Sequence, residues 1–339
     1  AWWATALFAS TPASLLLGTI ATPDAPLLCF WVWTLWALLT QRTVLIGVLW
    51  GFAMLSKYNG ILLGLPVLLA LWRKPLQLIA ATGIAFVVTS PTIIWNALND
   101  WEGFRFQFAH GLGGGGSLAT FLEFIGGQFG LAGPIFLGLT IFWLAKGDRN
   151  AVLKWATALP VLFFGYASVK ARGEANWTAA AWLSASVGIA LLPWRKWLRA
   201  ALGLNVALIV GVVAFLCVPI AASWRSPPVQ KLHGWAALAE LSKHQLPTFT
   251  DRYQLSAMVS YSSGLDSTTF GGRRSQYDLW PQPKIATGGD ALWVSEWGGP
   301  PQELVDCFER HEQLDWPIDD KQRALHPFQV WKLSAAKPH

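Results

Sequence analysis

The chain has 339 residues, of which 53% are hydrophobic and 13% are charged, and its mean hydropathy is +0.39. These values exclude a water-soluble protein of ordinary composition and favour a protein whose solvent is the lipid bilayer. The formal net charge is +6, but the basic residues lie in short clusters between apolar segments, so we expect no nucleic-acid partner.

Apolar segments fill the first two thirds of the chain and predict a polytopic, all-α membrane bundle of about eight or nine segments. The chain starts inside the first of these segments, and we expect that earlier helices and a first outer loop precede it. The apolar segments lie at 1–20, 26–40, 44–56, 59–72, 76–98, 120–145, 151–169, 176–193 and 198–222.

Basic clusters assign the two sides of the membrane. Arg42, Arg73 and the clusters at 146–154 and 195–199 fall on one side, which the positive-inside rule makes cytoplasmic. The other loops then face outward. This topology requires residues 44–72 to cross twice or to re-enter, with a break at the polar residues before Gly60, where the freed backbone must be shielded by protein.

The composition becomes ordinary after Pro227 and Pro228. We therefore predict a membrane domain at 1–222 and a soluble, outward-facing α/β domain at 223–339. Apolar residues three positions apart, from Leu232 to Leu241, indicate a helix. Short strands are expected at 248–250, 268–270, 291–295 and 328–333, and a further helix at 302–314.

Asp24 lies at an expected helix junction on the outer side, in Ala-Thr-Pro-Asp-Ala-Pro-Leu. Its carboxylate could bind a divalent metal ion or accept a proton. The alternative is a structural role as the N-cap of the helix that begins at Ala25, with Pro26 in the first turn.

Lys57 lies in Met-Leu-Ser-Lys-Tyr-Asn-Gly, between two apolar stretches. An ammonium group there could neutralise a phosphate at the membrane surface. The alternative is a lysine that extends to the interface, but such lysines occur near the ends of spans, and Lys57 is central in the double run.

A short outer loop contains Lys170, Arg172, Glu174 and Asn176. It combines cations that bind phosphate with a carboxylate, although a solvated loop would have a similar composition. Outer positive charge runs against the positive-inside rule and favours an anionic ligand. His110, before the glycine-rich stretch 111–116, could bind metal or transfer a proton, but an isolated histidine is more often structural.

Three motifs at these positions resemble bacterial membrane glycosyltransferases of the GT-C type. This group includes the dolichyl- or polyprenyl-phosphate-mannose protein mannosyltransferases (family 39) and the lipid A aminoarabinose transferase. The motifs are Thr-Pro-Asp-Ala-Pro-Leu at 22–27, Leu-Ser-Lys-Tyr at 55–58 and Glu-Ala-Asn-Trp at 174–177. The order of the segments and the soluble domain, with Arg-Ser-Gln-Tyr-Asp-Leu-Trp at 274–280, are also similar to this family.

The resemblance implies an inverting transfer of a sugar from a polyprenyl (undecaprenyl-type) phosphate to a protein, lipid A or glycan acceptor. The reaction would take place at the periplasmic face of a bacterial inner membrane, in a GT-C type bundle with a periplasmic domain. By the same resemblance, Asp24 and Glu174 are catalytic, with Asp24 also holding a divalent metal ion; Lys57, Tyr58, Lys170 and Arg172 bind the donor phosphate; and Asn176 and His110 line the cavity.

One departure from the family leaves other functions open. The family's main catalytic carboxylate lies in the first outer loop, which would precede Ala1. The chain is then part of a longer enzyme, or a degenerate paralogue that serves as a scaffold subunit. A transporter or flippase of a lipid-linked anion would also use broken helices and cations near the membrane, although we find no inverted repeat of the kind such transporters carry.

Overall fold

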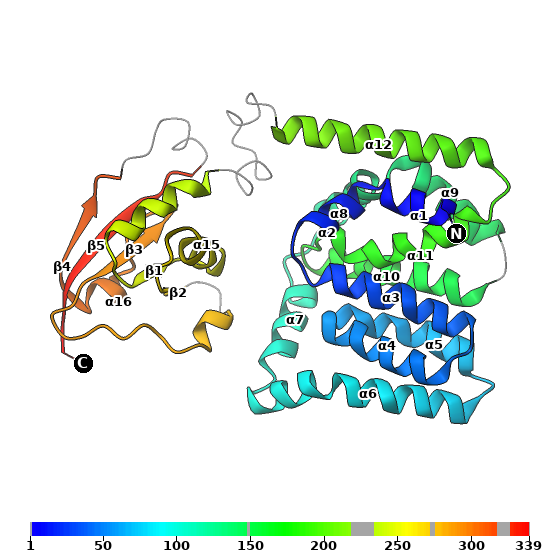
Figure 1. Cartoon of the computed structure of the whole chain (residues 1–339), viewed down its shortest axis with the longest axis horizontal. Helices are drawn as coiled ribbons and strands as arrows, with labels where there is room; N and C mark the ends of the chain where they lie inside the picture. The colour runs from blue at the N-terminus through cyan, green and yellow to red at the C-terminus, as the bar shows by residue number, and fades with distance from the viewer. Residues whose placement is uncertain (1, 148–149, 218–233, 272–274, 317–325, 339) are drawn as a thin grey trace. The chain divides into compact units, whose positions relative to one another are not determined.

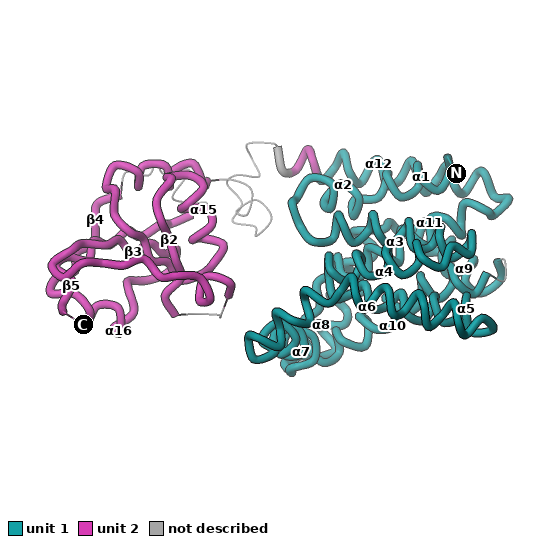
Figure 2. The backbone as a smooth tube through the Cα atoms, turned by 60° about the horizontal axis from the view of Figure 1, so that its bottom comes forward, with its two compact units in different colours: residues 1–212 teal, residues 213–339 magenta. Residues whose placement is uncertain are grey.

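The computed structural model describes residues 2–147, 150–217, 234–271, 275–316 and 326–338. It divides into two compact units, Ala1–Val212 and Val213–His339 (Figure 2). The predicted domain boundary between residues 222 and 223 falls outside the described residues. The two units are described separately below.

The first unit is helical (Figure 1). Its elements are α1 (Trp2–Ala9), α2 (Pro12–Thr19), α3 (Asp24–Leu39), α4 (Thr43–Ser56), the 3₁₀ helix η1 (Tyr58–Leu63), α5 (Gly64–Leu71), α6 (Pro75–Leu98), α7 (Glu102–Leu112), α8 (Leu118–Ala132), α9 (Pro134–Lys146), α10 (Ala151–Lys170), the 3₁₀ helix η2 (Ala175–Thr178), α11 (Ala179–Ala190) and α12, which runs from Arg195 to Cys217 across the unit boundary.

Several of the apolar helices are long enough to cross a membrane, as predicted. Among the described residues there are three, in α6, α10 and α12, or up to five if each sharply bent helix pair counts as one span. The bent pairs are α2 with α3, at 118°, and α8 with α9, at 101°. Within the described residues every predicted apolar run is helical, but prolines and caps divide some of the runs into shorter helices. Thr11 and Pro12 split 1–20, for example, and Pro134 splits 120–145.

The predicted break between residues 44 and 72 is confirmed. Helix α4 ends at Ser56, and Lys57 is extended, with φ −160° and ψ 141°. The chain then folds back against α4, where the Trp50 indole donates to the carbonyl oxygen of Gly60 at 3.1 Å. A Cβ atom on Gly60 would lie 2.4 Å from the carbonyl carbon of Ala53, so only glycine allows this close return.

Small residues allow the helices of the first unit to pack closely. Gly47 and Gly51 lie one turn apart on α4, and a Cβ atom on Gly47 would lie 2.6 Å from the Ala81 carbonyl oxygen of α6. The same spacing of small residues brings membrane helices together elsewhere. On α11, Gly188 makes the equivalent contact with the indole of Trp143. The core therefore depends on close backbone approach as well as on large apolar side chains.

The second unit is a mixed five-stranded sheet in the order β2-β1-β3-β5-β4. Strand β1 pairs parallel with both β2 and β3, whereas β5 pairs antiparallel with β3 and β4. The strands are β1 (Thr248–Thr250), β2 (Ser267–Thr269), β3 (Ala291–Ser295), β4 (Phe308–Leu314) and β5 (Gln329–Ala336). The helices are η3 (Trp235–Lys243), α15 (Tyr253–Ser263), which joins β1 to β2, η4 (Gln276–Asp278) and α16 (Gln302–Val305).

The sequence predicted four of these strands to within a few residues, but the predicted helix at 302–314 was wrong. The helix stops at Val305, and Phe308–Leu314 forms the edge strand β4. Its run of exposed polar side chains resembles a helix in composition, while pairing with β5 decides its structure. The three-residue spacing of Trp235, Leu238 and Leu241 corresponds to a 3₁₀ helix, which has three residues per turn.

Candidate functional site

A partly buried ion pair joins two of the predicted motifs. Asp24 is the first residue of α3 and is only 3% exposed. Its Oδ1 accepts a hydrogen bond from Lys57 Nζ at 2.7 Å, and its Oδ2 accepts one from Asn176 Nδ2 at 3.2 Å. The fold thus brings together one residue from each of the three motifs. The alternative role as an N-cap is wrong, because Pro23 occupies the N-cap position of α3 and no side chain caps this helix.

Local structure fixes the position of each partner in this group, which we call the Asp24 cluster (Asp24, Lys57 and Asn176). Lys57 is the C-cap of α4, where a cation is favourable because the helix dipole ends in negative charge. Asp24 lies in the first turn of α3, where an anion is favourable for the corresponding reason. Asn176 is in η2, between α10 and α11.

An apolar cavity of about 410 Å³ lies beside the cluster. Lys57 lines it and supplies a positive charge at the wall, and Tyr58 and Trp177 line it as well. Most of the other lining side chains are apolar; they include Met54, Ile61, Leu62, Ile93, Phe104, Phe108, Phe163 and Phe164. A cavity with apolar walls and a few polar groups suits an amphipathic ligand with an anionic head.

Tyr58 is positioned by Asn96, a residue that the sequence analysis missed. Asn96 is fully buried on α6, and its Nδ2 donates to Tyr58 Oη at 3.1 Å. Its Oδ1 accepts the backbone N–H of Phe104 at 3.1 Å, in the first turn of α7. That turn has no side-chain cap of its own. Asn96 therefore ties Tyr58 to the helix that forms one wall of the cavity.

Gln128 on α8 was also missed and supports the segment that carries Asn176. Its Oε1 accepts bonds from Thr178 Oγ1 at 2.6 Å and from Trp182 Nε1 at 3.1 Å, and its Nε2 donates to the Ala175 carbonyl at 3.2 Å. The signal available in the sequence was a carboxamide inside an apolar run, since a buried polar group in a membrane needs a partner.

The remaining predicted residues lie outside the Asp24 cluster. Lys170 is exposed and packs over the ring of Tyr166, and Arg172 is exposed and pairs with Glu123 at 3.3 Å. Glu174 is also exposed. His110 stacks on Phe106, with 5.7 Å between ring centroids, and meets Trp177 edge-on at 5.4 Å. His110 thus lies next to a residue that lines the cavity.

The residues described do not fit a metal ion. No three His, Cys, Asp or Glu side chains in the described ranges come together to hold one. The two oxygens of Asp24 already bond to Lys57 and Asn176, and no two further His, Cys, Asp or Glu side chains join Asp24 within the described ranges. A metal ion held by Asp24 stays a prediction from the resemblance.

Comparisons with known proteins bear on the identity of the chain. Residues 1–95 match the family model of dolichyl-phosphate-mannose-protein mannosyltransferases, a range that includes Asp24 and Lys57. The lipid A galacturonosyltransferase RgtD of Rhizobium johnstonii is 29% identical over 240 residues, an alignment covering 65% of this chain and 50% of that protein. The chain thus spans about half the length of this relative, and no solved structure matches. The matches confirm the predicted resemblance: the chain is similar to membrane glycosyltransferases of the GT-C type.

Proposed function

We propose that this chain is the core of a membrane enzyme that transfers a sugar from a polyprenyl (undecaprenyl-type) phosphate to an acceptor hydroxyl, with inversion. The proposed location is the periplasmic face of a bacterial inner membrane, with the second unit in the periplasm. The name of the relative makes lipid A the first acceptor to test and galacturonic acid the first sugar. Protein and glycan acceptors remain further candidates.

One observation carries the proposal: Lys57 both lines the apolar cavity and bonds to a buried carboxylate. The apolar walls suit a prenyl chain, and the ammonium group suits the phosphate that the chain carries. A cation near a membrane-buried site is costly to maintain, which favours a functional role over a purely structural one.

The proposed reaction forms one bond and breaks one. The acceptor oxygen attacks the anomeric carbon, the bond from that carbon to the phosphate oxygen breaks, and the bonding electrons leave with the polyprenyl phosphate. Lys57 stabilises the charge that develops on this phosphate. When Lys57 turns toward the phosphate, Asp24 Oδ1 becomes free to accept the hydroxyl proton, while Asn176 still holds Oδ2.

The exposed outer-loop residues keep their predicted roles within this proposal. Lys170 and Arg172 would add positive charge for the donor phosphate, and Glu174 would be a second carboxylate near the acceptor. No step of the reaction as written uses a metal ion, because the described residues do not assemble a site for one.

The test is a transfer assay with the protein expressed from its full reading frame and reconstituted in lipid nanodiscs. Radiolabelled undecaprenyl-phosphate sugars serve as donors and lipid A as the acceptor. Lys57→Ala should lower turnover by about 10²- to 10³-fold, the effect of removing one group that stabilises transition-state charge. The matched control is Lys74→Ala, an exposed lysine that also lies at a helix end, and it should leave turnover unchanged.

Three results would contradict the proposal. Full turnover in Lys57→Ala would remove this residue from the donor site. Absence of transfer from every donor, together with movement of a labelled lipid across the bilayer of proteoliposomes, would support the transporter alternative. Absence of both activities in the wild-type protein would support the scaffold alternative.

A further inference from the structure

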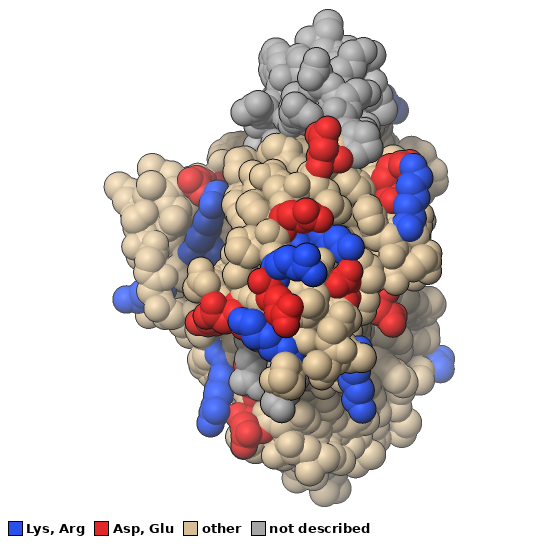
Figure 3. Space-filling view, turned by 90° about the vertical axis from the view of Figure 1, so that its left-hand side faces the viewer, with Lys and Arg blue, Asp and Glu red and all other residues tan. Residues whose placement is uncertain are grey.

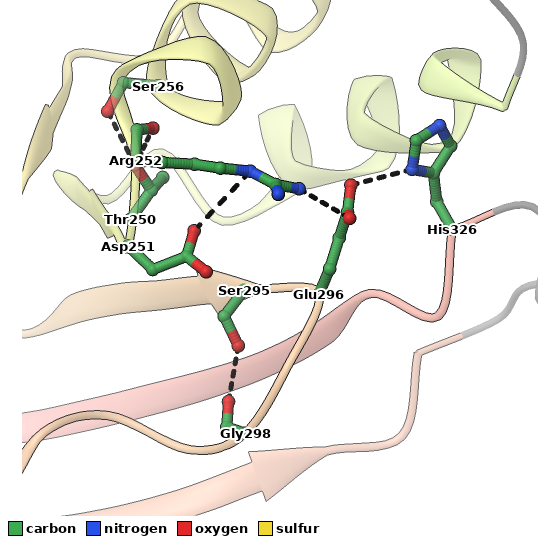
Figure 4. Close-up of polar contacts among 8 residues, drawn as sticks. All are labelled: Thr250, Asp251, Arg252, Ser256, Ser295, Glu296, Gly298 and His326. Atoms are coloured by element: carbon green, nitrogen blue, oxygen red, sulfur yellow. Dashed lines mark hydrogen bonds and ion pairs between the residues drawn. The ribbon is translucent and has the colours of Figure 1, made fainter. Parts of the chain in front are cut away.

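The second unit places a group of polar side chains where two parallel strands end. Asp251 and Arg252 follow β1, and Glu296 follows β3, its parallel neighbour (Figure 4). From β1 the chain passes through α15 to β2, on the opposite side of β1 from β3. Ligands of open α/β sheets bind at such a point, outside the carboxyl ends of the strands, where the strand order changes direction.

Glu296 is buried and holds the guanidinium group of Arg252 in place. Its Oε2 pairs with Arg252 Nη2 at 2.5 Å, and its Oε1 shares a 2.7 Å hydrogen bond with His326 Nδ1. The imidazole in turn packs against Trp235 and Phe328, with centroid distances of 4.2 and 5.2 Å. Burial alone would raise the pKa of Glu296, but the bonds from His326 and Arg252 outweigh it and lower the pKa. Glu296 therefore stays ionised.

Asp251 is left incompletely paired beside this fixed group. Its Oδ1 is buried, yet it accepts no hydrogen bond within the described residues. The nearest cationic atom, Arg252 Nε, is 4.0 Å away, which is beyond hydrogen-bond distance. Burial raises the pKa of Asp251 above its usual value, against the opposing effect of Arg252. A turn of this partly exposed side chain would bring the oxygen to the surface, where the hydroxyl group of a ligand would supply the missing donor.

An exposed tryptophan follows directly in the chain. Trp297 is 69% exposed. It sits in a tight turn that is closed by a hydrogen bond from Ser295 Oγ to the Gly298 carbonyl, with Gly298 at φ +93°. The turn is anchored at Gly299, where a Cβ atom would lie 3.2 Å from the Trp331 indole. The exposed indole next to Glu296 in the chain offers an aromatic face on which the apolar side of a sugar ring can pack.

We propose that the carboxyl ends of β1 and β3 form a binding site for a saccharide with neighbouring hydroxyl groups. One hydroxyl donates to Asp251 Oδ1, a neighbouring hydroxyl accepts from Arg252, and an apolar face of the sugar ring packs on Trp297. The two carboxylates, Asp251 and Glu296, disfavour an anion, whereas a hydroxyl group can satisfy both the unpaired acceptor and the guanidinium donors. The site goes beyond the proposed transfer reaction and does not require it.

Saturation-transfer difference NMR tests the site on the full chain in lipid nanodiscs. Nanodiscs are needed because maltoside detergents carry the same chemistry as the ligand. The probes are maltotriose, mannotriose and β-1,4-galactotriose, which present different hydroxyl patterns, and trigalacturonate as an anionic counterpart. At least one neutral trisaccharide should give a signal, and Asp251→Asn and Trp297→Ala should each reduce it by about fivefold or more.

Two controls match these variants closely. Asp290→Asn makes the same change at the amino end of β3, in a side chain with 29% exposure against 30% for Asp251. Tyr261→Ala removes an aromatic side chain that is 87% exposed, near the far end of α15. Both controls should keep the signal of the wild-type protein.

Three results would overturn the proposal: no signal with any neutral trisaccharide, a signal that survives in both site variants, or a signal with trigalacturonate alone. If the two variants give different signals, the result for Asp251→Asn decides the outcome. This substitution preserves the shape of the side chain, whereas Trp297→Ala can disturb the turn. Displacement of the bound probe by delipidated lipid A saccharide would assign the site to acceptors, and displacement by a short-chain prenyl-phosphate sugar would assign it to donors. Failure of the transfer reaction would leave this binding result unaffected.

Discussion

Each of the two units contains an aspartate that is at least partly buried, but the two carboxylates differ in their hydrogen bonding. In the first unit both oxygens of Asp24 are satisfied, by Lys57 and by Asn176. In the second unit Asp251 keeps a buried oxygen with no hydrogen bond in the described part of the chain. A satisfied carboxylate holds its neighbours in place, whereas an unsatisfied one is available to a ligand. In the first unit the bond between Lys57 and Asp24 must break before Asp24 can accept a proton. In the second unit Asp251 lacks a hydrogen-bond donor, which a ligand can supply.

The surroundings explain part of this difference. A charge in the apolar interior of the first unit cannot be solvated, so it has to be paired. The surface of the second unit carries interspersed basic and acidic side chains (Figure 3), and water can compensate an incomplete pair there. We therefore expect changes at the Asp24 cluster to cost more stability than changes at Asp251, and the predictions below follow that order.

The largest effect is expected from breaking the partly buried pair. Lys57→Ala should lower the free energy of unfolding by about 3 kcal/mol, because it leaves the Asp24 carboxylate without its cation. Adding Asp24→Asn removes the uncompensated charge and should recover much of that loss of stability, without restoring the turnover lost in Lys57→Ala. The measurement is the fraction of protein that remains monodisperse after heating in nanodiscs. If the double variant is less stable than Lys57→Ala, the cost does not come from an uncompensated carboxylate.

An intermediate effect is expected at the buried amide. Asn96→Ala removes the bond to Tyr58 and the acceptor that caps α7, and should cost about 1–3 kcal/mol. Hydrogen exchange followed by mass spectrometry should show faster exchange in peptides covering Glu102–Leu112, next to the cavity. The control is Asn99→Ala, whose Nδ2 bonds to the nearby Trp95 carbonyl at the surface. Equal exchange in both variants would mean that Asn96 does not hold α7.

These two cases show what the sequence could and could not predict. Asp24, Lys57 and Asn176 were found because a charged or polar group beside an apolar run stands out, and because the motifs resembled a family. The pairing of Lys57 with Asp24 was not predicted, because the residues are 33 positions apart in sequence and meet only through packing. Asn96 and Gln128 were missed because their partners, Tyr58 and Thr178, lie on other elements.

The fold shows the same division. Four strands of the second unit followed from short runs of β-branched, aromatic and other apolar residues. The edge strand Phe308–Leu314 did not, because its pairing with β5 is not encoded locally. Apolar runs predicted the membrane helices, but their division into shorter helices depended on residues such as Pro12 and Pro134 within those runs.

A smaller effect, of opposite sign in two variants, is expected in the second unit. The pKa of Glu296 is lowered in the folded protein, so its ionised form contributes stability above its usual pKa, and this contribution is lost as the pH falls through the lowered value. Glu296→Gln should therefore destabilise the unit at pH 7. The pKa of Asp251 is raised, so its contribution is present at low pH and lost as the pH rises through the raised value.

Asp251→Asn should accordingly stabilise the second unit at pH 7, by an amount on the order of 0.5 kcal/mol, with no gain below about pH 3, where the wild-type carboxyl is also protonated. Exchange rates of the β1 and β3 amides, measured at both pH values, report the change locally. A loss of stability at pH 7 in Asp251→Asn would show that the carboxylate has a partner in solution, which would remove the contrast with Asp24.

The smallest effect on stability is expected at the exposed pair of Arg172 and Glu123, whose side chains are 78% and 60% exposed. Surface ion pairs of this kind contribute about 0–1 kcal/mol. Arg172→Ala should therefore leave the fraction of protein that remains monodisperse after heating in nanodiscs nearly unchanged. Its predicted role in binding the donor phosphate can then be measured separately, since any rise in KM for the donor cannot come from unfolding. We expect a rise of about tenfold, the contribution of one charge-assisted contact. Glu123→Gln, the control, should leave the KM for the donor unaltered. If Arg172→Ala also leaves this KM at the wild-type value, Arg172 does not bind the donor, and donor recognition is confined to the Asp24 cluster.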